Sequence, residues 1–206
     1  MFEKYCKILQ LGDTAIKDIF EGDWVVEEKI DGSNFRFGID KNNNRFFGSK
    51  EVNYSEERPV DKMFVNAVKN ASECLDLAVE KIREKYPDQE IEFFTEYLSS
   101  IQQNSLTYSI VPEKNLVLLD AIINNEYVDL ETRRFFSQAL GLITPQLISK
   151  GITAPTQVEL NSWLDIESVL GGTKIEGVVI KNYSKRWVLN SKTFPYMAKL
   201  VREEFK

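Results

Sequence analysis

Residues 28–34 read Glu-Lys-Ile-Asp-Gly-Ser-Asn, and this stretch decides how the rest of the chain is interpreted. The strand-forming residues Trp24-Val25-Val26 come shortly before it, and Asp31-Gly32 within it is a turn signal. A single lysine between a strand and a turn is usually a solvated surface charge. The hypothesis drawn from this stretch is that Lys29 is a nucleophile, and the remaining residues must supply the groups that such a lysine needs.

The sequence contains no histidine. Histidine is the commonest metal ligand in proteins and the only side chain whose unperturbed pKa lies near neutrality. Its absence excludes Ser-His-Asp hydrolases, Cys-His proteases, histidine zinc sites and acid–base schemes that use histidine. Any catalysis therefore depends on lysine, carboxylates, a hard metal ion or a bound cofactor.

The composition is that of an ordinary globular protein. The 206 residues, of which 43% are hydrophobic, are enough for a sizeable core. No repeat or Pro/Gly/Ser linker divides the sequence, which predicts a single domain over residues 1–206. Cys6 and Cys74 lie far apart without C-x-x-C spacing, so we expect two buried thiols.

No run reaches the roughly 18 apolar residues of a membrane span. We expect a monomer in the cytoplasm, or in the host cytoplasm if the source is viral.

Charge is distributed unevenly along the chain. The net charge is -6, but residues 174–206 contain eight Lys/Arg and three Asp/Glu, a local charge of +5, so the other residues carry -11. An acidic surface repels phosphate, whereas a basic segment attracts it. Two interpretations of this segment stay open, a phosphate-facing surface and a solvated charged face.

The pattern of apolar residues predicts an α+β fold with antiparallel sheets flanked by helices. Helices are expected at residues 13–20, from Pro59 until Pro87-Asp88 stops the helix, at residues 130–140, and from the Thr156-x-x-Glu159 capping box to Gly171-Gly172. Strands are expected at residues 24–30, 35–39, 45–47, 90–98, 115–123, 127–128, 174–182, 187–190 and 196–201.

Five charged residues interrupt apolar strand patterns, namely Glu96, Asp120, Glu176, Lys181 and Lys199. Each alone could be the polar face of a half-buried strand, but five at strand ends suggest one shared cleft. Lysine is a weak nucleophile at its usual pKa of about 10.4 and needs desolvation or neighbouring cations, which Lys181 and Lys199 could supply. With carboxylates for ribose hydroxyls and Mg²⁺, this set of groups indicates phosphoryl chemistry.

The motif Lys29-x-Asp31-Gly32 resembles the nucleotidyl-attachment motif of the covalent nucleotidyltransferases, the superfamily of ATP-dependent ligases and mRNA capping enzymes. The resemblance extends through Asn34 to further motifs, in order, at residues 48–50 (Gly-Ser-Lys), 94–96 (Phe-Thr-Glu), 119–120 (Leu-Asp), 176–181 (Glu-Gly-Val-Val-Ile-Lys) and 199–201 (Lys-Leu-Val). The sequence is most similar to RNA ligases of the RNA ligase 2 type, over essentially the whole chain.

This resemblance implies a nucleotidyltransferase fold of the ATP-grasp-like adenylation type and the activity of an ATP-dependent RNA ligase. Lys29 would attack the α-phosphate of ATP to form lysyl-AMP, the AMP would pass to an RNA 5′-phosphate, and a 3′-hydroxyl would displace it. The implied catalytic residues are Lys29, Glu176, Lys181 and Lys199. Glu176 is also the implied ligand of Mg²⁺ or Mn²⁺, directly or through water.

The resemblance also implies a set of nucleotide-binding residues: Glu28, Ile30, Asp31, Gly32, Asn34, Lys50, Glu96, Leu119, Glu176, Lys181 and Lys199. In this scheme backbone groups of Glu28 and Ile30 recognise adenine. Lys50, where relatives usually have an arginine, and Glu96 contact the ribose. Asn34 lies near the phosphates or the RNA end.

Two positions depart from the family pattern. Leu119 stands where relatives commonly stack an aromatic ring on the purine, and Val201 replaces the second lysine of the usual K-x-K ending, with Arg202 next to it. The sequence ends soon afterwards with no C-terminal RNA-engaging domain visible, which favours self-adenylylation over efficient sealing. Two alternatives stay open: a non-catalytic nucleotide- or RNA-end-binding module, and a nucleotidyltransferase of the DNA ligase or capping type. Nicked duplex RNA, single strands and tRNA all remain open as substrates.

Overall fold

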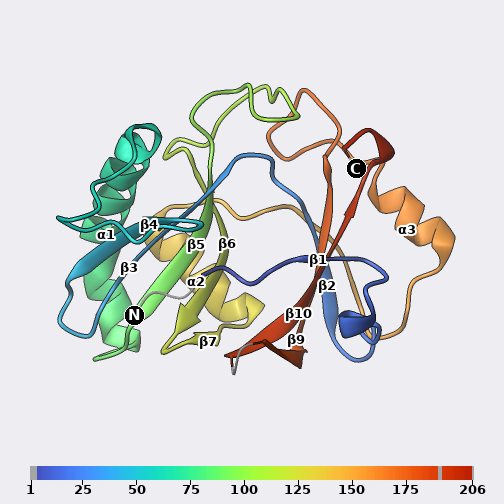
Figure 1. Ribbon diagram of the computed structural model, residues 1–206, viewed down its shortest axis with the longest axis horizontal. Helices are drawn as coiled ribbons and strands as arrows, with labels where there is room; N and C mark the ends of the chain where they lie inside the picture. The colour runs from blue at the N-terminus through green and yellow to red at the C-terminus, as the bar shows by residue number, and fades with distance from the viewer. Residues whose placement is uncertain (1–3, 190–191, 206) are drawn as a thin grey trace. The chain divides into compact units, whose positions relative to one another are not determined.

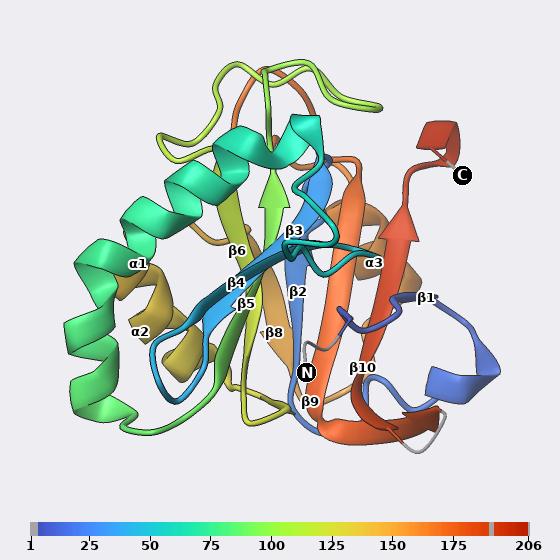
Figure 2. The same ribbon diagram turned by 60° about the vertical axis from the view of Figure 1, so that its left-hand side comes forward.

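The computed structural model describes residues 4–189 and 192–205 (Figures 1 and 2). The chain divides into two compact units, each assembled from separate stretches of sequence. The first unit contains Lys4 and Tyr5 with residues 32–100 and 111–144. The second contains residues 6–31, 101–110 and 145–206. One boundary between the units therefore falls between residues 31 and 32, inside the stretch 28–34.

The first unit is built around an antiparallel sheet with strand order β4-β3-β5-β6-β7. Its elements are β3 (Ser33–Ile39), β4 (Arg45–Ser49), a 3-10 helix (Lys62–Phe64), α1 (Val65–Lys85), β5 (Ile91–Tyr97), β6 (Leu116–Ile123), β7 (Glu126–Tyr127) and α2 (Leu130–Leu140). α1 and α2 contact each other, and both contribute side chains to the core on one side of the sheet (Figure 1).

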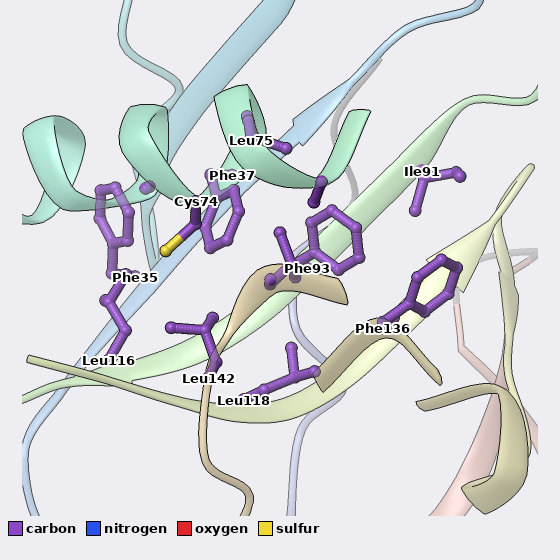
Figure 3. Packing of buried hydrophobic residues seen from close by; sticks show 14 of the residues in the cluster. Phe35, Phe37, Cys74, Leu75, Ile91, Phe93, Leu116, Leu118, Phe136 and Leu142 are labelled. Atoms are coloured by element: carbon purple, nitrogen blue, oxygen red, sulfur yellow. The ribbon is translucent and has the colours of Figure 1, made fainter. Parts of the chain in front are cut away.

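Aromatic rings from the sheet fill the core of this unit (Figure 3). The Phe93 ring lies 5.2 Å from that of Phe37 on the neighbouring strand and 5.2 Å from that of Phe136 on α2, measured between centroids. Alternation along a strand sends every second side chain to this face. Arg36 therefore points to the opposite face, where its guanidinium lies 3.4 Å from the Glu92 carboxylate.

The second unit contains a sheet with strand order β1-β10-β9-β2-β8, in which only the β1–β10 pair is parallel. Its elements are β1 (Leu9–Gln10), a 3-10 helix (Thr14–Ile16), β2 (Trp24–Glu28), β8 (Leu147–Gly151), α3 (Gln157–Trp163), β9 (Gly177–Leu189), β10 (Lys192–Val201) and a 3-10 helix (Glu203–Phe205). β9 and β10 are the longest strands and run side by side in Figure 2. A smaller core forms where Trp163 of α3 packs on Trp24, with 5.8 Å between ring centroids.

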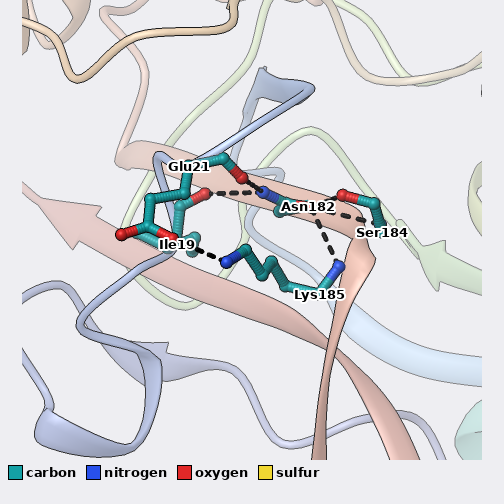
Figure 4. Close-up of polar contacts among 5 residues, drawn as sticks. All are labelled: Ile19, Glu21, Asn182, Ser184 and Lys185. Carbon is teal, nitrogen blue, oxygen red and sulfur yellow. Dashed lines mark hydrogen bonds and ion pairs between the residues drawn. The ribbon is translucent and has the colours of Figure 1, made fainter.

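Asn182 is a buried polar residue in β9 that ties distant segments together (Figure 4). Its Nδ2 donates to the carbonyl oxygens of Ile19 at 3.0 Å and Glu21 at 2.9 Å. Its Oδ1 accepts from the backbone amides of Ser184 and Lys185, both at 3.1 Å. One side chain thus satisfies backbone groups that would otherwise be buried without partners.

Several sequence-based predictions are confirmed. The α+β class with antiparallel sheets is correct, and α2 has the predicted bounds and ends at Gly141 in a left-handed conformation with φ 65°. The capping box of Thr156 and Glu159 is present at the start of α3. Cys6 and Cys74 are both free and buried. No helix within the part of the chain that the structure describes is long and apolar enough to cross a membrane.

Some predicted helix bounds are wrong. The helix expected at residues 13–20 is reduced to a 3-10 helix at Thr14–Ile16. The helix expected from Pro59 begins at Val65, because Asp61 is extended, with ψ 137°, and precedes a 3-10 turn.

The remaining differences lie after residue 146. α3 ends at Trp163 and not at Gly171-Gly172, because these glycines, with φ 68° and 80°, connect Glu167 to Lys174, which form a β-bridge. Of the strands predicted at residues 174–182 and 187–190, residues 177–182 and 187–189 belong to the single strand β9, which begins at Gly177, and residue 190 lies outside the described residues. The sequence pattern missed β8 and β1 altogether. β8 lies at one edge of its sheet and has no clear alternation, so the pattern gave no signal.

We expect Asn182→Ala to lower the free energy of unfolding by about 2–4 kcal/mol, because two buried carbonyls and two amides lose a partner. Urea denaturation followed by tryptophan fluorescence measures the change. Ser184→Ala, which leaves the bonds from Nδ2 intact, is the control and should cost less than about 1 kcal/mol. Equal losses in the two variants would contradict the assignment.

Candidate active site

The backbone of Lys29 is fixed where β2 ends. The amide of Lys29 donates to the carbonyl of Gly177, the first residue of β9, at 2.9 Å. A Cβ on Gly177 would lie 2.4 Å from the carbonyl oxygen of Leu200, so only glycine fits there without displacing the backbone. This backbone hydrogen bond therefore holds Glu176 and Gly177 next to Lys29.

The side chains of Lys29 and Glu176 form an ion pair. Nζ of Lys29 lies 2.7 Å from Oε2 of Glu176, and the two side chains are 24% and 11% exposed. Such a short contact is a charge-assisted hydrogen bond. The ion pair fixes the orientation of the Lys29 amine. A lysine amine becomes a nucleophile only when it loses its proton.

A second ion pair is buried on the β2–β9 sheet. Nζ of Lys181 lies 2.9 Å from Oε2 of Glu27, and the side chains are 3% and 1% exposed. In this register Val25 stands opposite Lys181 and Glu27 opposite Val179, so Glu27 and Lys181 share one face. Sequence reasoning missed Glu27. The available signal was a pair of consecutive acids inside an otherwise apolar strand.

Lys199 lies on the same face as Lys181. It stands opposite Val179 in the β9–β10 register and is half-buried. Among residues 4–189 and 192–205, no carboxylate forms an ion pair with Lys199. The second unit thus places Lys199 as a half-buried cation beside the Glu27–Lys181 pair.

Other basic residues near the C-terminus are neutralised by carboxylates. The pairs are Lys174 with Asp165, Lys185 with Glu21, and Arg202 with Glu204. These contacts reduce the positive charge that the segment from residue 174 onward presents to an anion.

Buried carboxylates anchor the residues on both sides of Lys29. Asp31 is 5% exposed, and its Oδ2 accepts from the amides of residues 105 and 106 at 2.6 and 2.8 Å. Glu28 is 1% exposed and accepts from the Ser168 hydroxyl at 2.5 Å and the Val169 amide at 3.0 Å. Burial raises the pKa of Glu28 above its ordinary 4.5, although both hydrogen bonds oppose the shift. Ile30, between these anchors, is also buried.

The first unit holds the other predicted nucleotide-binding residues. Asn34 and Glu96 stand directly opposite each other on β3 and β5. Oδ1 of Asn34 is buried, and no residue that the structure describes donates a hydrogen bond to it. A Cβ on Gly32 would lie 2.8 Å from both Cγ of Glu96 and the carbonyl oxygen of Tyr97, so the turn requires glycine.

Lys50 and Leu119 are also in the first unit. Lys50 is exposed after the end of β4. The β5–β6 register shifts between Phe94 and Thr95, which leaves the half-buried Leu119 as the extra residue of a β-bulge.

Asp120 has a structural role within the first unit. It is 1% exposed and accepts a hydrogen bond from the hydroxyl of Tyr5, whose ring centroid lies 5.0 Å from that of Phe94. The five charged strand residues are thus divided between the units, with Glu96 and Asp120 in the first and Glu176, Lys181 and Lys199 in the second.

Clusters of metal ligands are missing from the part of the chain that the structure describes. Within the described ranges, 4–189 and 192–205, no group of three or more Cys, Asp or Glu side chains is placed to hold one. Mg²⁺ commonly binds proteins through one or two carboxylates and takes its other ligands from phosphates and water. Glu176 fits a site of that kind.

The family model described as RNA ligase matches residues 22–201 of this chain. The chain therefore belongs to the RNA ligase family, and the resemblance drawn from its motifs is confirmed. No curated protein is significantly similar to it in sequence.

Solved structures of an RNA ligase from Naegleria gruberi have the same fold. The structure of that ligase with PPi is 14% identical in sequence, with a TM-score of 0.66. A variant with ATP and Mn and another with AMP and Mn are each 12% identical, again with a TM-score of 0.66. Each comparison covers 96% of this chain and 56% of that one, so this chain spans little more than half the length of those ligases.

We expect Glu28→Gln to gain stability relative to the unmodified protein as the pH rises. The folded-state pKa of Glu28 is raised. The contribution of Glu28 to the free energy of unfolding is therefore fully present below its unfolded-state pKa of 4.5 and is lost as the pH rises through its folded-state pKa. Glutamine stays neutral throughout. Urea denaturation of both proteins from about pH 4 to about pH 8 measures the difference. The exposed Glu84→Gln is the control, and a difference for Glu28→Gln that does not depend on pH would contradict the prediction.

Proposed function

We propose that this chain is an ATP-dependent RNA ligase that adenylylates itself on Lys29. The observation that carries the proposal is the placement of the Lys29 amine 2.7 Å from the Glu176 carboxylate, within a chain of the RNA ligase family. The sheet that fixes this pair also presents Lys181 and Lys199, the cations expected for phosphate chemistry.

In the proposed first step, the Lys29 amine loses a proton and its nitrogen attacks the α-phosphorus of ATP. A phosphorus–nitrogen bond forms, the bond to the bridging oxygen of the β-phosphate breaks, and pyrophosphate leaves. Glu176 orients the amine toward the phosphorus. Lys199, without a carboxylate partner among the described residues, neutralises negative charge on the phosphates.

Lys181 has a different electrostatic setting from Lys199. Because Glu27 already pairs with it at 2.9 Å, Lys181 adds less net positive charge to the sheet face. We propose that Lys181 contacts a phosphate oxygen while Glu27 holds it in place.

Further nucleotide contacts are proposed for the other motif residues. Backbone groups of Glu28 and Ile30 recognise adenine. Lys50 and Glu96 contact the ribose, Leu119 packs on the purine, and Asn34 binds near the phosphates or the RNA end. The buried Oδ1 of Asn34 supports this assignment, because a bound hydroxyl or water would supply the donor that the described residues do not.

A divalent cation, Mg²⁺ or Mn²⁺, would supply charge neutralisation at the phosphates when bound. Glu176 is the carboxylate that would hold it, directly or through water. The scarcity of further carboxylates there fits an ion that takes most of its ligands from the nucleotide and water.

The later steps join RNA. An oxygen of an RNA 5′-phosphate attacks the phosphorus of the bound AMP and the phosphorus–nitrogen bond breaks, which restores the Lys29 amine. An RNA 3′-hydroxyl then attacks the 5′-phosphate, a phosphodiester forms, and AMP leaves.

We expect label from α-³²P-ATP to become covalently attached to the protein in the presence of Mg²⁺, and to be stable to alkali but released by warm acid, as a phosphoramidate is. Lys29→Ala should carry no label, because the attacking nitrogen is gone. Lys69→Ala, a change on α1, is the control and should label normally. Label that persists in Lys29→Ala would overturn the assignment.

The same assay distinguishes the alternative functions. Label from GTP in place of ATP would indicate a capping-type enzyme, and label only from adenylate-labelled NAD would indicate another cofactor. ATP binding without release of pyrophosphate would indicate a non-catalytic binding module.

We expect RNA affinity to weaken as salt rises, but with a shallow dependence. Three ion pairs neutralise cations of the basic C-terminal segment, so we expect fewer phosphate contacts than its eight Lys/Arg would give, each adding roughly -0.7 to the slope of log affinity against log salt for a single strand. Fluorescence anisotropy with a 5′-phosphorylated oligonucleotide measures the slope. Affinity independent of salt would contradict these contacts.

A further inference from the structure

Two loops of the second unit are bound to the residues that flank Lys29. The first loop spans residues 101–110. The amides of Ser105 and Leu106 donate to Oδ2 of Asp31 at 2.6 and 2.8 Å, and the amide of Asp31 donates to the hydroxyl oxygen of Tyr108 at 2.8 Å. Asp31 is thus held through both its side chain and its backbone.

The second loop spans residues 166–175. The Ser168 hydroxyl donates to Oε1 of Glu28 at 2.5 Å and accepts from the amide of Leu170 at 3.1 Å. The amide of Val169 donates to the other oxygen of Glu28 at 3.0 Å. Ser168 therefore organises the loop and binds the residue just before Lys29.

The two loops are also bound to each other. The amide of Ser109 donates to the carbonyl of Gly171 at 3.0 Å, and the amide of Ile110 donates to the carbonyl of Leu170 at 3.2 Å. A Cβ on Gly172 would lie 2.9 Å from the backbone nitrogen of Ser109, so the approach is close. A continuous ring of hydrogen bonds therefore runs from residue 28 through both loops to residue 31.

Lys29 lies inside this ring, and its neighbours cannot shift without breaking several buried hydrogen bonds. Tyr108 and Ser168 are 2% and 6% exposed, so water cannot readily replace them as partners. Burial is the main cause of the raised pKa of Tyr108, which keeps its hydroxyl neutral. A neutral hydroxyl can accept from the Asp31 amide without adding charge near Lys29.

We propose that Tyr108 and Ser168 are positioning residues that hold the backbone of Lys29 in the geometry required for attack on the α-phosphate. The proposal rests on the proposed function of Lys29. Neither residue supplies a reacting group. Each acts through a neighbour of the nucleophile, Tyr108 through Asp31 and Ser168 through Glu28.

The test compares Tyr108→Phe and Ser168→Ala in single-turnover adenylylation at varied ATP. Because small misplacement of a nucleophile costs up to about 100-fold in rate, we expect a loss of about 10-fold to 100-fold at saturating ATP. The ATP concentration at half-saturation should change by less than about threefold, because neither residue is among the proposed nucleotide contacts. Tyr86→Phe and Ser162→Ala are the matched controls and should keep the unmodified rate. Ser168→Thr retains the hydroxyl and should restore most of the rate.

A merely structural role predicts a different result. In that case the fractional loss of rate would equal the unfolded fraction measured by urea denaturation. The adenylylation rate of Ser168→Thr would then depend only on the stability of that variant. Unchanged rates at saturating ATP in both variants would overturn the proposal.

Amide hydrogen exchange separates this proposal from the proposed function, because it needs no ATP. We expect exchange at residues 28–31 to speed up about tenfold or more in Tyr108→Phe and Ser168→Ala, but not in the controls. If amide exchange at residues 28–31 is faster in the variants but the unmodified protein takes no label from ATP, Lys29 is rejected as a nucleophile. The ring of hydrogen bonds is then still supported as the restraint on the backbone of Lys29. Unchanged exchange would reject the positioning role, whether or not the protein labels.

Discussion

The antiparallel pairing of β2 with β9 is the constraint on which the second unit depends. It joins residue 29 to Gly177 through a backbone hydrogen bond, and so brings the Lys29 amine to Glu176. The same register sets Glu27 beside Lys181 in a buried pair. A slip of one residue would turn the charged side chains to the opposite face, where the core around Trp24 excludes them. The β2–β9 register therefore determines both ion pairs, Glu27 with Lys181 and Lys29 with Glu176.

The sequence predicted elements well where local chemistry was sufficient. α2 begins with an aspartate cap and ends at a glycine, and both signals lie within a few residues of the helix they delimit. β8 could not be predicted in this way, because it is held by pairing with β2 from a distant part of the chain. The prediction that a helix ends at Gly171-Gly172 was wrong for a similar reason. Their turn is defined by a bridge between Glu167 and Lys174, which a local pattern does not show.

The sequence predicts candidate site residues but not the contacts that these residues make. Motifs identified Lys29, Glu176, Lys181 and Lys199, but nothing in their spacing indicated that Glu27 neutralises Lys181 while Lys199 has no such carboxylate in the described part of the chain. Tyr108 gave no signal, since one tyrosine in a polar loop has no periodicity. Its role follows from a hydrogen bond across 77 positions of sequence. Long-range hydrogen bonds of this kind are properties of the folded chain.

The discontinuous construction of the second unit has a consequence during synthesis. β2 is complete by residue 28, yet its partners β8 and β9 begin only at Leu147 and Gly177. At about 5–20 residues per second the nascent strand waits on the order of ten seconds without a neighbour. An unpaired apolar strand is prone to aggregate, and charges within it suppress that tendency. Glu27 and Glu28, whose carboxylates are buried in the folded protein, place two such charges directly after Trp24-Val25-Val26.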